Sequence, residues 1–232
     1  MENRCYLAMT AAEFQNCSSL QGRIAWMSCH FSSYGKGLSN LPHVLPPGSM
    51  LVLDDANPVG EHEPEMVLHQ LQAAVKTHIC SCILLDFQRS GSKETTAMAE
   101  YLTKGLSCPV AVSHIYAKEL SCAVLLPPLL PDVPLNEYIQ PWSGREIWLE
   151  LAQSSTGCRV TQNGAQSFTL TNCPDASFHD KELCCHYSID IQSDHVDFIL
   201  HRTREDLTAL MDQAEKLGIT RFVGLWQEFG NI

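Results

Sequence analysis

Residues with the capacity for chemistry recur in this chain directly after, or at the end of, short apolar runs. They are His30, Asp54, Asp55, Asp86, Gln88, His114, Tyr116, Glu150, Trp226 and Glu228. Carboxylates accept hydrogen bonds from sugar hydroxyls, and an indole ring offers an apolar face to a pyranose ring. A phosphate site would instead need lysine, arginine and glycine. The set therefore favours a groove for a neutral, hydroxyl-rich ligand.

Several of these residues also have a structural explanation. Asp54 and Asp55 could begin a loop or cap a helix, Trp226 could belong to the core, and His30 and His114 could be ordinary structural histidines. No HxH or HExxH pair indicates a metal centre, and no GxSxG motif indicates a serine hydrolase. No glycine-rich phosphate loop follows any apolar run, so we expect neither a metal nor a cofactor.

The apolar runs themselves predict the scaffold. Eight of them span residues 4–9, 23–28, 50–53, 82–85, 109–112, 123–126, 146–151 and 221–226. Continuous apolar runs are typical of parallel strands buried on both faces. Helical spacing follows several of them, over residues 64–77, 93–105 and 205–217. Eight strand–helix units predict an α/β fold, a (β/α)8 TIM-like barrel, with its active-site residues at the carboxyl ends of the strands.

Two features qualify this barrel. The connections after the second and fifth runs are too broken or too short for full helices, which predicts a partly degenerate barrel; a doubly wound open sheet is the competing architecture. Residues 158–169 and 188–200 alternate between apolar and polar, and the first segment contains Asn163-Gly164. This pattern predicts a small antiparallel insertion over residues 153–200, before the last helix and strand. We expect residues 1–232 to form one barrel domain containing this insertion.

Composition narrows the class of protein. Hydrophobic residues make up 45% of the chain, enough for a sizeable core and against disorder. Lysine and arginine total 15 against 26 acidic residues, giving a formal charge of -11 and no basic stripe for nucleic acid or an anionic membrane. The acidity could simply confer solubility or could line a groove.

The 11 cysteines include several within apolar runs, where they are interpreted as small core residues in a reducing compartment. Cys158, Cys173, Cys184 and Cys185 cluster in the insertion, which leaves a local disulfide or metal site open there. No signal peptide or membrane span is evident, so we expect a cytoplasmic protein, or a secreted one if a leader has been removed. The sequence does not indicate an oligomeric state.

Two segments resemble the family 18 glycoside hydrolases, the chitinase-like barrels. Residues 82–88, Cys-Ile-Leu-Leu-Asp-Phe-Gln, are similar to the family's fourth strand, which ends in Asp, an aromatic residue and Glu. Residues 186–228 are similar to its closing segment: an alternating flap, a helix ending in Leu217-Gly218, and a strand closing on Trp226. Together they cover about a fifth of the chain.

The resemblance implies roles for three residues. Asp86 would orient a substrate acetamido group, Trp226 would stack on a sugar, and Gln88 stands where the family keeps its proton-donating glutamate. The family's reaction is substrate-assisted, and a glutamine amide cannot protonate the leaving oxygen. Losing a general acid typically costs about 10²–10⁴ in rate. The family's aspartates before the acid are also replaced, by Ile83, Leu84 and Leu85.

Three functions follow. The first is a non-catalytic glycoside hydrolase-like barrel, a pseudoenzyme, that binds a carbohydrate or peptidoglycan fragment. Its binding residues would be Asp86, Gln88, Trp226, Tyr116, Glu228 and His30. The second is an active glycosidase that uses other carboxylates; its catalytic candidates are Asp86, Gln88, Asp54, Asp55 and Glu150, with Glu228 also available. The third is a structural or interaction barrel without a ligand.

Overall fold

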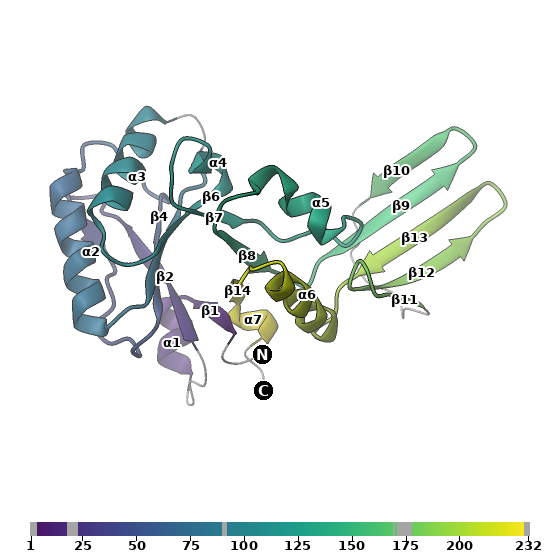
Figure 1. The fold of residues 1–232 in the computed structure, drawn as a ribbon, viewed down its shortest axis with the longest axis horizontal. Helices are drawn as coiled ribbons and strands as arrows, with labels where there is room; N and C mark the ends of the chain where they lie inside the picture. The colour runs from purple at the N-terminus through teal and green to yellow at the C-terminus, as the bar shows by residue number, and fades with distance from the viewer. Residues whose placement is uncertain (1–3, 18–22, 90–91, 169, 171–177, 230–232) are drawn as a thin grey trace.

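Eight parallel strands close into a barrel in the computed structural model, which describes residues 4–17, 23–89, 92–168, 170 and 178–229 (Figure 1). The strands are β1 (Cys5–Met9), β2 (Arg23–Phe31), β4 (Met50–Asp54), β5 (Cys82–Asp86), β6 (Val110–Ser113), β7 (Ala123–Leu126), β8 (Ile147–Leu151) and β14 (Arg221–Leu225). β1 pairs in parallel with both β2 and β14, which closes the ring. This closure confirms the predicted (β/α)8 TIM-like fold and excludes the open doubly wound sheet.

Alternate residues of these strands divide between two cores. One core fills the barrel and includes Tyr6, Val52, Leu84 and Trp148. The other lies between the strands and the surrounding helices. Because successive side chains of a strand point to opposite faces, a strand that serves both cores must be apolar throughout. The uninterrupted apolar runs of the sequence are the consequence.

The three predicted helices are present, and local signals fix their ends. α2 (Pro64–His78) begins with Pro64 in its first turn, and α3 (Lys93–Gly105) is capped by Ser92. α6 (Arg204–Lys216) ends in a Schellman motif with Gly218 at φ +85°. Gly105 packs closely on Leu68: a Cβ at this position would lie 2.4 Å from a Leu68 methyl group, which would have to shift.

The remaining connections carry little structure, as predicted for a degenerate barrel. After β2 the chain forms only the two-residue β3 (Leu38–Ser39), antiparallel to β2, and after β6 it forms the single turn α4 (His114–Ala117). The other short elements are α1 (Ala11–Asn16), α5 (Leu135–Ile139), the 3₁₀ turn η1 (Gln140–Trp142) and α7 (Trp226–Phe229). The final strand therefore ends at Leu225, one residue before the predicted end. Phe229 of α7 lies over Gly224, where a Cβ would meet its ring at 2.4 Å.

An antiparallel sheet of five strands is inserted between β8 and α6 and projects away from the barrel (Figure 1). Its strands are β9 (Ser155–Thr161), β10 (Gly164–Phe168), β11 (Phe178–Asp180), β12 (Cys185–Ile191) and β13 (His195–His201). Their order in space is β10-β9-β13-β12-β11. The predicted β-rich insertion is thus present, with strands over 155–201.

The insertion leaves and rejoins the barrel at neighbouring points. Ser155 is the register partner of His201, and the Arg202 amide donates to the Ser154 carbonyl at 3.0 Å. Thr203 then caps α6, since its hydroxyl accepts from the Asp206 amide while the Asp206 carboxylate accepts from the Thr203 amide. The two ends of the inserted segment are therefore held together by backbone pairing and by the start of α6.

The cysteines of the insertion form no disulfide among the described residues. Cys158, Cys184 and Cys185 are thiols, and the latter two are buried. Cys173 lies outside the described residues. Burial raises the pKa of the Cys185 thiol to about 11, which disfavours the thiolate. Cys184 and Cys185 are accordingly small core residues, and Cys158 is half-buried.

Candidate functional site

Three carboxylates occupy inward-facing positions at the carboxyl end of the barrel. Val52, Leu84 and Trp148 point into the barrel core, and the residues two positions later are Asp54, Asp86 and Glu150. Strand alternation places these three side chains on the same inner face, at the end where the strands stop. With Glu228, whose charge acts on Glu150, we call them the mouth carboxylates.

A β-bulge brings His30 to the same face. Before the bulge, Ile24 and Trp26 point outward; after it, Cys29 and Phe31 do. The register shift between Trp26 and Cys29 therefore turns His30 inward, where its Nδ1 lies 2.7 Å from Asp54 Oδ2. Both side chains remain half-buried. The sequence named both residues, but their pairing depends on a bulge that no sequence signal marks.

Asp86 and Gln88 meet at the end of β5. Gln88 Nε2 donates to Asp86 Oδ1 at 2.5 Å, and the Gln88 side chain is exposed. Burial raises the pKa of the Asp86 carboxyl, the Gln88 hydrogen bond opposes that rise, and the charges of Asp54 and Asp55 add to it. The residues matched to the family's orienting aspartate and proton donor are thus in direct contact, but the contact is an amide-to-carboxylate hydrogen bond.

Glu150 is the mouth carboxylate with the most perturbed acidity. Burial, together with the negative charges of Asp86 and Glu228, raises the pKa of its carboxyl to about 7. Glu228 is fixed nearby, since its Oε2 accepts from the Gln153 amide at 2.7 Å. A carboxyl that titrates near neutral pH can donate or accept a proton there.

Tyr138 is a neighbour of Glu150 that the sequence did not indicate. Burial, together with the charge of Glu150, raises the pKa of its phenol to about 12. Its hydroxyl donates to the Pro127 carbonyl at 2.7 Å, at the end of β7. The tyrosine belongs to α5, whose place over the mouth could not be inferred from so short a helical segment.

Two of the predicted site residues hold the scaffold instead of facing the mouth. Asp55, one residue beyond the inward-facing Asp54, is buried, and its carboxylate accepts from the amides of Gln88 and Arg89 at 2.8 and 2.9 Å. Tyr116 is buried in α4, and its hydroxyl donates to the Arg89 carbonyl. Both side chains therefore fix the loop after β5, and neither is one of the residues that face the mouth.

Trp226 and His114 are both half-buried. Trp226 is the first residue of α7 and packs partly against the outer core, which leaves part of its ring accessible. His114 begins α4, directly after β6. Trp226 thus keeps the accessibility that sugar stacking would need.

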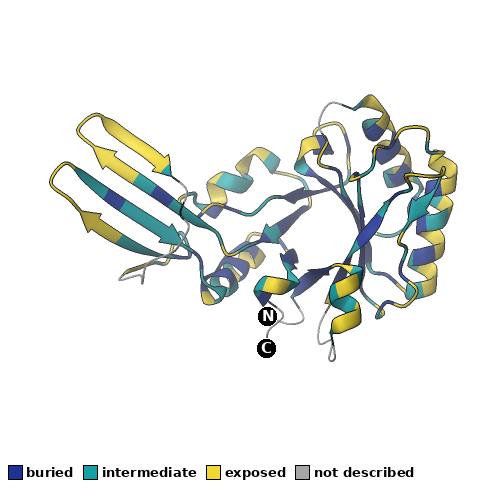
Figure 2. Ribbon diagram, turned by 180° about the vertical axis from the view of Figure 1, so that it is seen from behind, coloured by how far each residue is buried: buried dark blue, intermediate teal, exposed yellow. Residues whose placement is uncertain are grey.

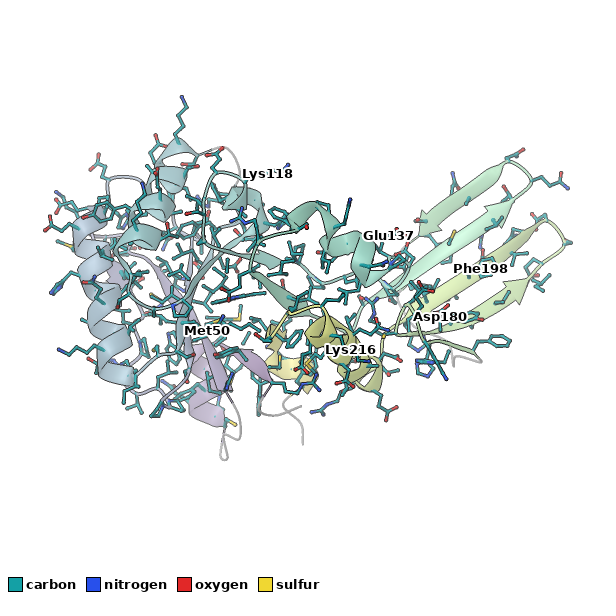
Figure 3. The ribbon with its side chains drawn as sticks, viewed as in Figure 1. Met50, Lys118, Glu137, Asp180, Phe198 and Lys216 are labelled. Carbon is teal, nitrogen blue, oxygen red and sulfur yellow. The ribbon has the colours of Figure 1, made fainter. Side chains whose placement is uncertain are left out.

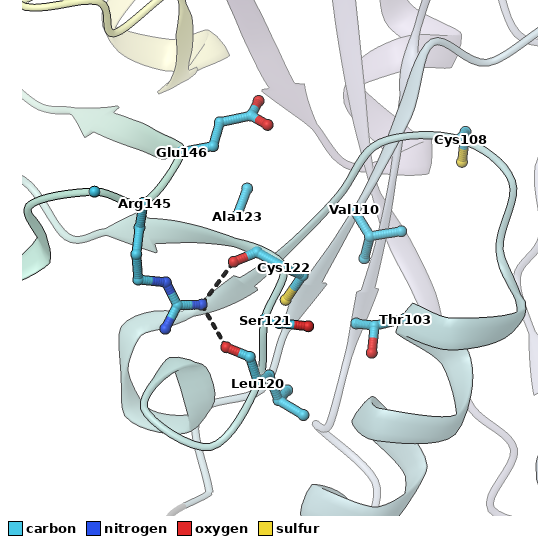
Figure 4. Close-up of a pocket in the computed structure, with 10 residues that line it drawn as sticks. Thr103, Cys108, Val110, Leu120, Ser121, Cys122, Ala123, Arg145 and Glu146 are labelled. Atoms are coloured by element: carbon cyan, nitrogen blue, oxygen red, sulfur yellow. Dashed lines mark hydrogen bonds between the residues drawn. The ribbon is translucent and has the colours of Figure 1, made fainter.

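A pocket of about 570 Å³ lies at the opposite end of the barrel, near the starts of β6, β7 and β8 (Figure 4). Arg145 lines it and donates to the carbonyls of Leu120 and Cys122 at 2.6 Å each, and also to the Ala117 carbonyl. Because three carbonyls occupy the guanidinium, Arg145 closes the loop between α4 and β7. This end of a parallel barrel generally serves stability, so we place the functional site at the mouth.

One group of side chains among the described residues has the composition of a metal site. His179, His186 and Asp206 each offer a ligand atom, and these atoms lie within 4.8 Å of one another. The group lies at the base of the antiparallel sheet, on β11, β12 and α6, and not among the mouth carboxylates. No motif predicted it, because strand pairing and not sequence spacing brings the residues together.

No helix in the described part of the chain combines the length and the hydrophobicity needed to cross a bilayer. No protein-family model matches the sequence, and no curated protein matches it.

The fold is similar to those of two spore cortex-lytic enzymes named SleL. The crystal structure of the Bacillus cereus enzyme matches with a TM-score of 0.56 and 10% identity, over 96% of this chain and 70% of that chain. The enzyme of Bacillus megaterium QM B1551 matches with a TM-score of 0.50 and 14% identity, over 87% of this chain. This chain spans 63% of the length of the latter. At these identities the likeness establishes the barrel fold.

Proposed function

We propose that the mouth of this glycoside hydrolase-like barrel binds a carbohydrate that contains N-acetylated sugars, such as a peptidoglycan glycan strand, without the substrate-assisted hydrolysis of the family it resembles. The contact between Gln88 and Asp86 carries the proposal. It joins an amide donor to a carboxylate where catalysis would need a carboxylic acid, and an amide has no proton to give to a leaving oxygen at neutral pH.

The composition of the mouth supports a polyhydroxylated ligand. Asp54, Asp86, Glu150 and Glu228 supply hydrogen-bond acceptors, Gln88 supplies an exposed amide, and Trp226 supplies a partly accessible ring. A pocket of about 420 Å³ lies beyond the ends of β2 and β4, lined by Ser32, Lys36, Asn57, Glu61 and His62 among others. Its lining begins two residues after His30, so the pocket lies on the His30 side of the barrel.

The similarity to spore cortex-lytic enzymes agrees with this ligand class. Their names describe lysis of the spore cortex, a function stated for those proteins alone. The fold offers the same strand ends for a ligand, and the residues on them decide whether binding or chemistry follows.

Calorimetric titration with N-acetylglucosamine oligomers tests the proposal. If the indole stacks on a sugar, Trp226→Ala should weaken binding by about 1–3 kcal/mol, the range measured for base–aromatic stacking. Trp142→Ala is the matched control, since Trp142 is also half-buried but lies on η1, before β8, where Arg145 packs over its ring. No binding by the unmodified protein, or an equal loss in both variants, contradicts the proposal.

A second candidate function, hydrolysis with Glu150 as the general acid, is favoured by one observation. The pKa of Glu150 is raised to about 7, so part of the carboxyl is protonated at neutral pH. Hydrolysis of the same oligomers by the unmodified protein would support it. Glu150→Gln should then reduce the rate by about 10²–10⁴, and activity should fall as pH rises above 7.

Gln88→Glu separates the two candidates. In a binding protein derived from the family's catalytic site, restoring the carboxylic acid should create measurable hydrolysis in a protein that otherwise has none. Where Glu150 is the acid, the unmodified protein is already active, and the Gln88 variant should change its rate by less than the Glu150 variant does. Reducing-sugar release and mass spectrometry of the oligomers measure both outcomes.

A further inference from the structure

Three histidines lie side by side across three strands of the antiparallel sheet. His179 of β11 is the register partner of His186 of β12, and His186 is the register partner of His201 of β13. Direct partners on neighbouring antiparallel strands point to the same face. Their ring centroids are accordingly 4.7 Å apart for His179 and His186, and 5.9 Å apart for His186 and His201.

A carboxylate from the barrel side completes this row. Asp206, in the first turn of α6, is 2% exposed. Its Oδ1 lies 3.0 Å from His179 Nε2, and its Oδ2 lies 2.7 Å from His186 Nδ1. The cluster sits where the sheet meets α6, close to the end of β11 at Asp180, which Figure 3 labels.

The donor set is that of a transition-metal site. Two imidazole nitrogens and one carboxylate oxygen suit Zn²⁺, which binds such ligands at about 2.0–2.2 Å. In tetrahedral geometry two such ligands lie roughly 3.3–3.5 Å apart. His179 Nε2 lies 3.0 Å from Oδ1 and His186 Nδ1 lies 2.7 Å from Oδ2, and one ligand atom from each of the three residues lies within 4.8 Å of the other two, so moderate side-chain shifts would bring them to these spacings.

Asp206 is already oriented as a metal-binding carboxylate would be. Its Oδ2 accepts from the amide and the hydroxyl of Thr203, at 2.8 Å each. Oδ1 is left facing His179. Hydrogen bonds of this kind orient ligating carboxylates in metalloproteins. The helix cap thus fixes the carboxylate whether or not an ion is bound.

The half-buried His201 carries an unpaired polar atom beside this row. Its Nδ1 is buried, and no hydrogen-bond partner for it exists among the described residues. Buried polar atoms are almost always paired, and an unpaired one calls for a partner such as an ion or a water. The atom belongs to the histidine next in the row after His186.

We propose that His179, His186 and Asp206 bind one divalent transition-metal ion of the zinc class, which joins the antiparallel sheet to α6. Three protein ligands leave one coordination position for water or another ligand. Solvent can reach it, because the side chains of His179 and His186 are 37% and 32% exposed. The alternative is a purely hydrogen-bonded group in which Asp206 pairs with both imidazoles and no ion binds.

Metal titration decides between them. Tag-free protein, stripped with a chelator and dialysed, is titrated with Zn²⁺ against a chromogenic indicator. The proposal predicts one equivalent bound with a dissociation constant of about 10 µM or tighter, and a loss of about 100-fold or more in His186→Ala and His179→Ala. His195→Ala is the matched control, since His195 is on β13 of the same sheet and also pairs with aspartates, Asp194 and Asp197. It should bind as the unmodified protein does.

Cobalt distinguishes this site from the cysteines. Co²⁺ bound by nitrogen and oxygen gives visible absorption without the intense near-ultraviolet thiolate band. A thiolate band, or one equivalent retained by both histidine variants, overturns the proposal. So does the absence of Zn²⁺ binding at about 100 µM, or a loss in His195→Ala equal to that in the other variants. The titration of the unmodified protein stands even if a variant fails to fold, and His179→Gln offers a milder change at the more exposed ligand.

Discussion

The strands of the barrel and those of the inserted sheet differ sharply in how far their side chains are buried. Barrel strands such as β5 and β7 are buried along almost their whole length, whereas β10 is exposed and β12 is buried only at its first residue. Figure 2 shows the same contrast, with dark blue barrel strands and a teal and yellow sheet. The sheet even exposes Val160, Phe178, Ile189 and Ile191. Apolar burial stabilises the barrel. The sheet is stabilised by its backbone pairing and by contacts at its own base, where it meets the barrel.

Arg202 makes several of the contacts at that base. It is buried, and its guanidinium donates to the carbonyls of Leu130, Leu183 and Cys184 at 3.2, 3.0 and 3.1 Å, and to that of Leu129. These carbonyls belong to the loop after β7 and to the turn between β11 and β12. Arg202 therefore joins the sheet to the barrel, alongside the pairs that His179 and His186 form with Asp206.

Trp148→Ala should lower the free energy of unfolding more than any other substitution proposed here, and it should act on the barrel. The indole is fully buried inside the barrel, so its loss should cost about 3–5 kcal/mol of unfolding free energy. Denaturant unfolding followed by circular dichroism measures the change. Ile191→Ala is the counterpart in the sheet, where the side chain is 74% exposed, and should change stability by less than about 0.5 kcal/mol. Equal effects would contradict the contrast between the two regions.

Arg202→Met should have the second largest effect on stability, and it should destabilise the inserted sheet. The substitution leaves four carbonyls without their donor, at a cost of about 2–4 kcal/mol. Hydrogen exchange read by mass spectrometry should show β11 to β13 losing protection before the barrel strands. Uniform loss across both regions would mean that the sheet and the barrel unfold together.

The third prediction concerns Glu150 at the barrel mouth and the dependence of the protein's stability on pH. The pKa of Glu150 is about 7 in the folded protein, against an ordinary glutamate pKa of 4.5. Its stabilising contribution is fully present below pH 4.5 and is lost as pH rises through 7. Glu150→Gln removes this dependence, so the variant should gain about 1–3 kcal/mol relative to the unmodified protein between pH 4.5 and 8. Unfolding midpoints across that range measure it, and a constant difference would show that Glu150 titrates normally.

The smallest effect is expected from Arg159→Ala. Arg159 forms a bidentate ion pair with Asp197 across β9 and β13, with nitrogen–oxygen distances of 2.8 and 2.7 Å. Water and salt screen the pair at the sheet surface, so its removal should shift the unfolding midpoint less than Trp148→Ala, Arg202→Met or Glu150→Gln does, and less still at high salt. A shift as large as that of Arg202→Met would show that the outer sheet is not held mainly by its base.

The sequence predicted what depends on pattern within a strand or helix. Eight apolar runs predicted the barrel, helical spacing predicted α2, α3 and α6, and Asp54, Asp86 and Glu150 lie at or near strand ends as expected. The resemblance also predicted that Asp86 and Gln88 are neighbours in one site, and their hydrogen bond is consistent with it.

The sequence could not predict features that depend on the register between strands or on a local break in the alternation of inward and outward side chains. A bulge in β2 turns His30 inward, and the end of β4 separates Asp54 from Asp55 by pointing them to opposite faces. Tyr116 is buried because β6 runs directly into α4. The histidine row requires the pairing of β11, β12 and β13, which alternation alone does not specify.

The pairing of Ser155 with His201 has a consequence for how such a molecule can change over time. Since the inserted segment departs and returns at adjacent positions, its length and content can vary without altering the path of β8 or the start of α6. The ring of eight strands can stay constant while natural or laboratory recombination exchanges the projecting part. The Arg202 amide already donates to the Ser154 carbonyl at 3.0 Å, so a shortened protein could join these two residues directly. Such a protein would retain the closed barrel and would lack His179 and His186, two of the three proposed metal ligands.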